Sequence, residues 1–346
     1  MGDLGENVHV QERCGAGGLL MVIARPPALL LSLATLLLAA GCSSGNSQPS
    51  SDPTTSAPSP STSTSPASSP TATTSTNAHG GKPSKLLVVV MENHSAASAT
   101  DGMPTLAAAA ARYGSATQSF GLTHPSLPNY LAIAGGSTFG VQDDNLPAVH
   151  PLSGSSVFGQ VLAAGKVAKT YAEGMASNCQ LTSGGQYAVK HNPWPYFTSP
   201  AERAGCLRYD VPAGTPASGN LHDDMAAGTL PTFGLLIPDL CNDAHDCSLS
   251  TADNWLRGWL RPLMASQDFR SGRLAIVVTF DEDHRDANNN ILTAVLDQRL
   301  HGSKVTARLD HTALSRSISR LVGASPLRDA ATAPDFLGAF GLASSG

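Results

Sequence analysis

A long tract of small and polar residues limits how much of this chain can fold into a core. Between Ser43 and Lys82 the sequence is nearly all Ser, Thr, Pro and Ala, with almost no charge and no apolar periodicity. Such a segment cannot bury enough apolar surface to offset the entropy that it would lose on ordering. We therefore predict a disordered linker over 43–82 and one folded domain over 83–346.

The segment before this tract has the pattern of an export signal. From Pro26 to Ala40 it is mostly Leu and Ala, and it is shorter than the roughly 20 residues of a membrane-spanning helix. It ends in Leu38-Ala39-Ala40-Gly41-Cys42, small residues followed by the cysteine that a lipoprotein signal peptidase requires. We expect residues 1–42 to be a signal peptide with a lipobox and Cys42 to be lipidated.

Two alternatives concern this segment. An ordinary secretory signal with an incidental cysteine would also place the protein outside the cytoplasm, as a secreted protein rather than an outward-facing membrane lipoprotein. A signal peptide should also open on a basic region, whereas the first residues include Asp3, Glu6 and Glu12. Our hypothesis is that translation starts at Met21, with Arg25 supplying the positive charge.

Charge and cysteine content exclude one class of partner and suggest internal cross-links. The net charge is −5 and there is no basic stripe, so we expect no nucleic-acid partner. Four cysteines remain besides Cys14 and Cys42, and an even number in an exported domain predicts disulfides. Spacing pairs Cys179 with Cys206 and Cys241 with Cys247, with free or metal-binding thiols as the alternative.

Strand and helix patterns alternate along the folded part. Apolar, β-branched runs predict strands, and Ala-rich or amphipathic segments predict helices. The predicted strands are 85–91, 167–171, 232–237, 274–280 and 291–296, and the predicted helices are 104–113, 157–164, 254–265 and 311–322. This order predicts an α/β fold, a three-layer α/β/α sandwich with a mostly parallel central sheet. Met175–Leu221 has little regular pattern and reads as a long insertion stapled by the first disulfide.

Acidic and imidazole side chains follow three of these strands. Glu92-Asn93-His94 follows the first, Asp239, Asp243 and His245 follow the third, and Asp281-Glu282-Asp283-His284 follows the strand over 274–280. Ligands bind beyond the carboxyl ends of parallel strands. Carboxylates gathered there repel one another unless a cation lies between them, so we predict a divalent metal ion. Solvated strand ends are the alternative.

The segment Thr123-His124-Pro125-Ser126-Leu127-Pro128-Asn129-Tyr130 leads into an apolar helix. Ser126 would lie at the helix start, where free N–H groups favour an anion such as phosphate. A serine hydroxyl is a poor nucleophile until a base or a metal activates it. Alternatively, Ser126 is a helix cap.

Five motifs together carry a resemblance to a known family. They are Met91-Glu92-Asn93-His94, His124 to Tyr130, His191-Asn192-Pro193-Trp194, Pro238 to Asp246, and Thr279-Phe280-Asp281-Glu282-Asp283. In this order they resemble the phosphoesterase family of bacterial phospholipases C and acid phosphatases, within the alkaline phosphatase superfamily. The resemblance covers 86–342 and is strongest to small secreted acid phosphatases, including mycobacterial-type phosphoinositide phosphatases.

The resemblance implies a role for each matching position. Ser126 would be the nucleophile, and Glu92, Asn93, Asp281 and Glu282 would hold the metal ion that Ser126 contacts. Asp239, Asp243, His245 and His311 would form a second metal or proton-relay cluster for the leaving group. His191 would reach toward the substrate phosphate. Asp281-Glu282 stands where many superfamily members have Asp-His, so magnesium, manganese or calcium is favoured over zinc, with one or two ions.

The sequence therefore predicts an acid-phosphatase-type hydrolase that cleaves phosphate monoesters through a phosphoserine. The expected partners are a small-molecule or lipid phosphate ester and, through the lipid anchor, a membrane, and the protein is expected to be a monomer. One alternative is a phosphodiesterase or phospholipase C acting on membrane lipids. Another is a surface lipoprotein that binds a ligand without turning it over.

Overall fold

The computed structural model describes residues 81–343. The predicted signal peptide, the lipidation of Cys42 and the linker up to Gly80 lie outside this range and stay predictions. Among the described residues, no helix is both long enough and apolar enough to cross a membrane.

The described domain is built on a central sheet. Within residues 81–343 this sheet has eight strands in the order β5-β4-β6-β1-β7-β8-β2-β9. Neighbouring strands are parallel except on either side of β8, which is antiparallel to β7 and β2. Its strands are β1 Lys85–Met91, β2 Gly114–Ala116, β4 Ala168–Ala172, β5 Asp210–Pro212, β6 Phe233–Ile237, β7 Leu274–Phe280, β8 Thr293–Leu296 and β9 Ser303–Val305. A two-stranded sheet pairs β3 Ser119–Phe120 with β10 Leu309–Asp310.

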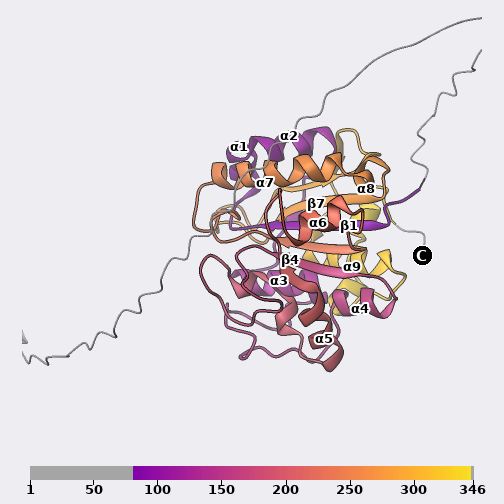
Figure 1. Cartoon of the computed structure of the whole chain (residues 1–346). Helices are drawn as coiled ribbons and strands as arrows, with labels where there is room; N and C mark the ends of the chain where they lie inside the picture. Colours follow the sequence, from indigo (N-terminus) through magenta and orange to yellow (C-terminus); the bar gives the residue numbers. More distant parts are fainter. Residues whose placement is uncertain (1–80, 344–346) are drawn as a thin grey trace, which may run out of the picture. The chain divides into compact units, whose positions relative to one another are not determined.

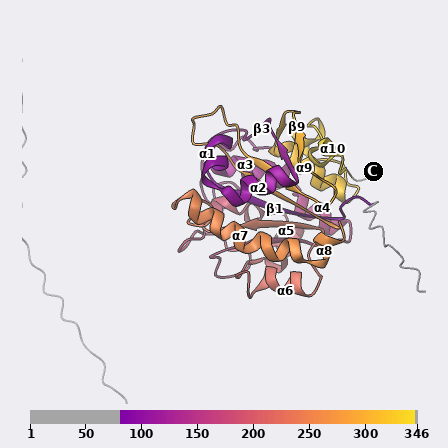
Figure 2. The ribbon, with the colours of Figure 1, turned by 90° about the horizontal axis from the view of Figure 1, so that it is seen from above.

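Helices cover both faces of the sheet, so the predicted three-layer α/β/α fold is confirmed (Figure 1). One layer contains α1 Ala96–Gly102, α2 Pro104–Arg112, α7 Leu249–Ala265 and α8 Gln267–Arg270. The other contains α3 Ser126–Gly135, α4 Val157–Ala163, α5 Pro200–Tyr209 and α9 His311–Leu321. Seen from above, α6 Asn220–Ala226 lies at one end of the domain, and β3, β9 and α10 Phe336–Ala339 lie toward the other (Figure 2).

The centre of the sheet follows directly from two apolar runs in the sequence. β1 and β7 pair along their whole length, from Lys85 opposite Leu274 to Met91 opposite Phe280. All of β7 is buried, and so is β1 after its first residue. Burying one such aliphatic side chain stabilises the fold by roughly 1.5–3 kcal/mol. This pairing fixes where the two strands end, so that the residues after Met91 and Phe280 leave the sheet side by side.

The structure differs from the prediction in the segment from Met175 to Leu221. This region contains a full helix, α5, and the edge strand β5, which pairs with β4. The short 3-10 helices η1 Val189–His191 and η2 Trp194–Tyr196 precede them. The sequence interpretation overlooked the N-cap at the start of α5, where the Ser199 hydroxyl accepts a hydrogen bond from the main-chain N–H of Glu202.

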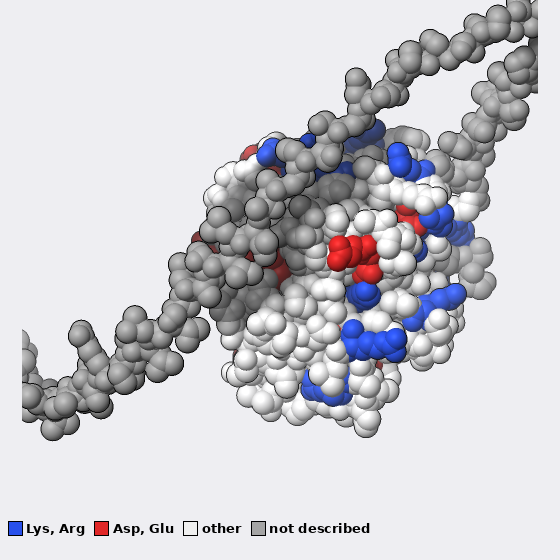
Figure 3. Space-filling view, viewed as in Figure 1, with Lys and Arg blue, Asp and Glu red and all other residues white. Residues whose placement is uncertain are grey.

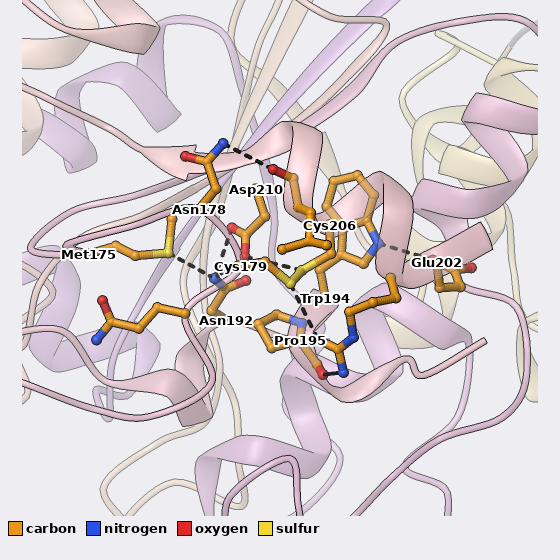
Figure 4. The surroundings of a disulfide bond; sticks show 12 residues. Met175, Asn178, Cys179, Asn192, Trp194, Pro195, Glu202, Cys206 and Asp210 are labelled. Carbon is orange, nitrogen blue, oxygen red and sulfur yellow. Dashed lines mark hydrogen bonds between the residues drawn. A yellow bond between two sulfur atoms is a disulfide. The ribbon is translucent and has the colours of Figure 1, made fainter. Parts of the chain in front are cut away.

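Both predicted disulfides are present in the described domain, Cys179–Cys206 and Cys241–Cys247. Figure 4 shows the first of them beside the buried carboxylate of Asp210. Both carboxylate oxygens of Asp210 accept hydrogen bonds from Asn192 Nδ2, at 2.9 Å each. Asn192 follows η1 directly, so this contact fixes the segment that carries His191.

Burial makes Asp210 sensitive to pH. Desolvation raises the pKa of Asp210 from 3.8 to about 8, although the hydrogen bonds from Asn192 oppose the shift. Between these values the folded protein binds a proton that the unfolded chain releases. The free energy of unfolding should therefore fall as pH rises from about 4 to about 8, by up to about 1.4 kcal/mol per pH unit.

An Asp210→Asn variant should lose this part of the pH dependence, because its amide does not titrate. Its stability relative to wild type should rise with pH in urea unfolding at pH 5 and pH 8. Asp223→Asn is the control, since the Asp223 side chain is 75% exposed. If Asp210→Asn and wild type show the same slope with pH, the role given to Asp210 is wrong.

Candidate active site

The carboxyl ends of three neighbouring strands bring the predicted acidic residues to one edge of the sheet. The order β6-β1-β7 places Glu92 between the segments that contain Asp243 and Asp281. The Glu92 N–H donates to the main-chain carbonyl of Asp243 at 2.9 Å, and the Asp281 N–H donates to that of Met91 at 3.0 Å. Main-chain hydrogen bonds alone thus bring the three carboxylate residues side by side.

Asn93 turns the chain away from the sheet immediately after Glu92. Its φ is +56°, in the left-handed region that Asn tolerates better than most residues. Its N–H donates to Asp281 Oδ1 at 3.0 Å. The turn therefore joins two of the predicted metal ligands.

Ser126 is the first residue of α3, as predicted, and it contacts the carboxylates. Its Oγ donates to Glu92 Oε2 at 3.0 Å. The preceding residue, Pro125, is extended and makes no side-chain cap. The Ser126 hydroxyl therefore faces the acidic cluster instead of capping its own helix.

Two residues further along α3 complete this contact. Asn129 and Tyr130 follow Ser126 by three and four positions, which places all three on one face of the helix. The Tyr130 hydroxyl donates to Glu92 Oε1 at 2.6 Å. Asn129 Nδ2 donates to Glu282 Oε2 at 3.1 Å. The sequence interpretation gave neither residue a role, although the helical spacing was a signal for both.

Burial favours the protonated, uncharged form of these carboxyl groups unless a cation is bound. Desolvation, and then the charges of Asp281 and Asp243, raise the pKa of Glu92 well above its usual range. Desolvation raises the pKa of Asp281 and of Asp243 to about 7 each. Desolvation and the neighbouring Asp281 raise the pKa of Glu282 to about 9. Ionising all four groups together would require a compensating positive charge.

Unpaired atoms at the same place fit a cation. Among the residues that the structure describes, Asp281 Oδ2, Asp243 Oδ2 and His191 Nε2 are buried without a hydrogen-bond partner. Buried polar atoms are rarely left in that state. Carboxylate, amide and hydroxyl oxygens are the ligands of hard divalent cations, and Glu92, Asn93, Ser126, Asp281 and Glu282 offer such a set.

His191 lies between two of the carboxylates. Its Nε2 is 3.2 Å from Glu92 Oε1 and its Nδ1 is 3.2 Å from Asp243 Oδ2. Its ring stacks on Tyr130 with a centroid distance of 5.2 Å, and only 1% of the residue is exposed. Desolvation, then Lys190 and His245, lower the pKa of His191 well below its usual range. Direct contact between His191 and a substrate stays a prediction.

His245 lies at the accessible side of the same cluster. Ligand atoms of Glu92, His191 and His245 lie within 4.8 Å of one another, which allows a second metal-binding group. The ring nitrogen Nε2 of His245 is 3.3 Å from Lys190 Nζ, and Nδ1 is 2.7 Å from Asp246 Oδ1. An ammonium group can only donate, so Nε2 is the acceptor and Nδ1 carries the proton.

Asp239 and His311 are placed apart from that group. Asp239 Oδ1 accepts the N–H groups of Cys241 and Asn242, which closes the turn after β6. His311 is buried at the start of α9, where Nε2 donates to the main-chain carbonyl of Asp281 at 2.6 Å. Within residues 81–343, neither shares a hydrogen bond or ion pair with His245, so their place in a second metal site stays a prediction.

The sequence interpretation assigned no role to three further residues that lie around the site. His124 bridges two carboxylates, with Nδ1 at 3.0 Å from Glu282 and Nε2 at 3.2 Å from Asp283. Lys190 and Asp144 form an ion pair of 3.0 Å beside the start of α3. Isolated charged residues in irregular segments give no periodic signal, so only the fold could place them.

Two adjoining cavities open next to these residues. One has a volume of about 240 Å³ and is lined by Asn93, His124, Glu282, Asp283, His284 and Arg285. The other, of about 460 Å³, shares His124, Asp283 and Arg285 with it and extends to Leu122, Thr123, Asn288 and Asn289. Two predicted metal ligands thus line a cavity with room for a small polar ligand.

Comparison with known proteins identifies the family. The sequence profile of the Phosphoesterase family matches residues 78–286. The chain belongs to this family. The match contains all the predicted catalytic and metal-binding residues except His311.

Named relatives agree with this membership. A phosphatidylinositol-3-phosphatase of Mycobacterium tuberculosis is 30% identical over 255 residues, covering 72% of this chain and 80% of that protein. An acid phosphatase of Aspergillus fumigatus is 31% identical over 188 residues, which cover 52% of this chain and only 40% of the fungal protein. A Vibrio parahaemolyticus protein of the alkaline phosphatase superfamily has the same fold, with a TM-score of 0.52, 12% identity, and coverage of 74% of this chain and 70% of that one.

Replacing Asn129 should destabilise the domain. Asn129 Oδ1 accepts the N–H of Leu122 at 2.8 Å, and Nδ2 donates to the Thr123 carbonyl at 2.8 Å. Asn129→Ala leaves these main-chain groups and Glu282 without their partner, which should cost on the order of 3 kcal/mol in urea unfolding. The control is Asn178→Ala, whose single contact to Leu207 is exposed. Equal losses in the two variants would contradict the anchoring role of Asn129.

Proposed function

We propose that this domain is a metal-dependent phosphatase that hydrolyses phosphate monoesters with Ser126 as its nucleophile. The observation that carries the proposal is the Ser126 hydroxyl at the start of α3, hydrogen-bonded to Glu92 inside a cluster of buried carboxylates with unpaired oxygens. The names of the relatives, acid phosphatase and phosphatidylinositol-3-phosphatase, support the same reaction.

Five residues would hold the cation, namely Glu92, Asn93, Ser126, Asp281 and Glu282. When bound, the ion would lower the pKa of the serine hydroxyl and offset negative charge on the phosphoryl group. The oxygen-rich donor set favours magnesium, manganese or calcium. Lys190 already places a positive charge 3.3 Å from His245 Nε2, which favours one ion over two.

The chain's own groups account for the nucleophilic step. Glu92 Oε2 accepts the hydrogen bond of the Ser126 hydroxyl, so an acceptor is in place for the proton that leaves as Oγ bonds to phosphorus. The bond from phosphorus to the ester oxygen breaks, and that oxygen takes up a proton in place of the one that Ser126 released, so that it leaves as the alcohol. Water then hydrolyses the phosphoserine, which releases phosphate and restores the Ser126 hydroxyl.

The surroundings of Ser126 orient its hydroxyl. Tyr130 fixes the other oxygen of Glu92, and Asn129 fixes Glu282. These residues share α3 with the nucleophile, so one helix positions the serine and two of the carboxylates around it. Such preorganisation reduces the reorganisation needed at the moment of reaction.

Ser126→Ala should abolish turnover while the fold and most of the bound metal persist, because four proposed ligands remain. Phosphate release from an aryl phosphate measures activity, and elemental analysis measures metal. Ser153→Ala, an exposed serine, should behave as wild type, and a chelator should inactivate the wild type. Residual turnover by Ser126→Ala would refute the nucleophile, whereas turnover of a diaryl phosphate diester but not of the monoester would favour the phospholipase-like alternative.

We also propose that the protein is exported and anchored by lipid on Cys42. Disulfides persist in oxidising compartments outside the cytoplasm, and the described domain holds two. Cys42→Ser should move the protein from the membrane fraction to the medium. Its retention in the membrane fraction would contradict the anchor.

A further inference from the structure

The side chain of Asp144 joins two groups next to the proposed nucleophile. Its Oδ1 accepts the main-chain N–H of Leu127 at 2.9 Å. Its Oδ2 accepts a hydrogen bond from Lys190 Nζ at 3.0 Å. Leu127 follows Ser126 directly in α3, so a carboxylate occupies the anion-binding end of this helix beside the serine.

The start of α3 offers few other donors. The ten-residue helix has Pro128 at its third position, which has no N–H. Besides the N–H of Ser126 itself, the Leu127 N–H is therefore the main-chain donor next in sequence to the Ser126 hydroxyl. The fully buried Asp281 Oδ2 has no hydrogen-bond partner in the described residues, and its side chain lies in the same carboxylate cluster as Glu92, the acceptor of the Ser126 hydroxyl. Asp144 therefore occupies a main-chain donor beside the same serine whose hydroxyl is bonded to Glu92.

The ammonium group of Lys190 has few hydrogen-bond partners besides Asp144. Apart from Asp144, the hydrogen-bond partner of Lys190 Nζ among the described residues is His245 Nε2, at 3.3 Å. Burial alone would lower the pKa of Lys190, but Asp144, and at greater distance Glu92 and Asp281, raise it. If the Asp144 carboxylate moved away, an ammonium and a main-chain N–H would both be left to bind another anion.

We propose that Lys190 Nζ and the Leu127 N–H bind oxygens of the substrate's phosphoryl group, and that Asp144 is an internal competitor for this position. The inference rests on the proposed phosphatase function. A phosphoryl dianion carries more charge and more acceptor oxygens than one carboxylate, so it can displace Asp144 from both donors. Lys190 is then a substrate-binding residue, and Asp144 sets how readily the position is vacated.

The segment that contains Asp144 can change its conformation without any repacking of the sheet. Residues 136–151 contain no helix or strand. The Asp144 side chain is 28% exposed and that of Lys190 is 20% exposed. Tyr196 holds the segment at the neighbouring Asn145 carbonyl, at 2.9 Å, so a swing of the Asp144 side chain suffices to free the donors.

The test uses the metal-loaded domain and inorganic phosphate as the probe. Calorimetry measures phosphate binding directly, and competitive inhibition of turnover by phosphate measures it a second time. If Asp144 holds the donors about nine-tenths of the time, Asp144→Ala should tighten phosphate binding about tenfold and lower KM similarly. Lys190→Met should weaken phosphate binding about tenfold and raise KM by a similar factor. Asp143→Ala is the matched control, because the adjacent Asp143 pairs with His150 and not with Lys190.

Each result decides the proposal. Unchanged or weaker phosphate binding in a folded Asp144→Ala variant would make Asp144 a structural cap and overturn it. If that variant unfolds, Asp144→Asn keeps an acceptor for the Leu127 N–H but loses the charge, and phosphate should still bind more tightly than to wild type. Tighter phosphate binding without turnover of any phosphate ester would preserve the subsite and remove the proposed function instead.

Discussion

Burial of several carboxylates at one point of the sheet is the constraint on which the rest of the structure depends. Glu92, Asp243 and Asp281 lie on neighbouring segments because β6, β1 and β7 are adjacent and parallel. All three are fully buried, and desolvation raises the pKa of each. Such a cluster is unfavourable unless donors and cations balance it. The tyrosine and the serine beside it supply donors, and a divalent ion would supply the remaining charge.

The insertion serves this cluster from outside the sheet. The Cys179–Cys206 disulfide and the pair of hydrogen bonds from Asn192 to Asp210 hold the segment that places Lys190 and His191 over the strand ends. On the face of the molecule in Figure 3, acidic and basic side chains are interspersed among uncharged ones.

The sequence predicted those parts whose signal is local. The apolar runs of β1 and β7 can only form buried strands, so the ends of these strands, and therefore the positions of Glu92 and Asp281, could be predicted. Sequence spacing also gave both disulfides. It could not place Asp144 or Lys190, which meet only because the insertion folds back over α3. It also missed α5, where an N-cap serine, rather than an apolar stripe, marks the start of the helix.

The central claim is that one cation binds among Glu92, Asn93, Asp281, Glu282 and the Ser126 hydroxyl. Anomalous diffraction from crystals of the domain grown with manganese tests it most directly. The account predicts a peak within about 2.0–2.4 Å of Ser126 Oγ and of the surrounding carboxylate oxygens, as in oxygen-ligand sites. A peak held instead by His191 and His245, or no peak at the strand ends, would contradict it.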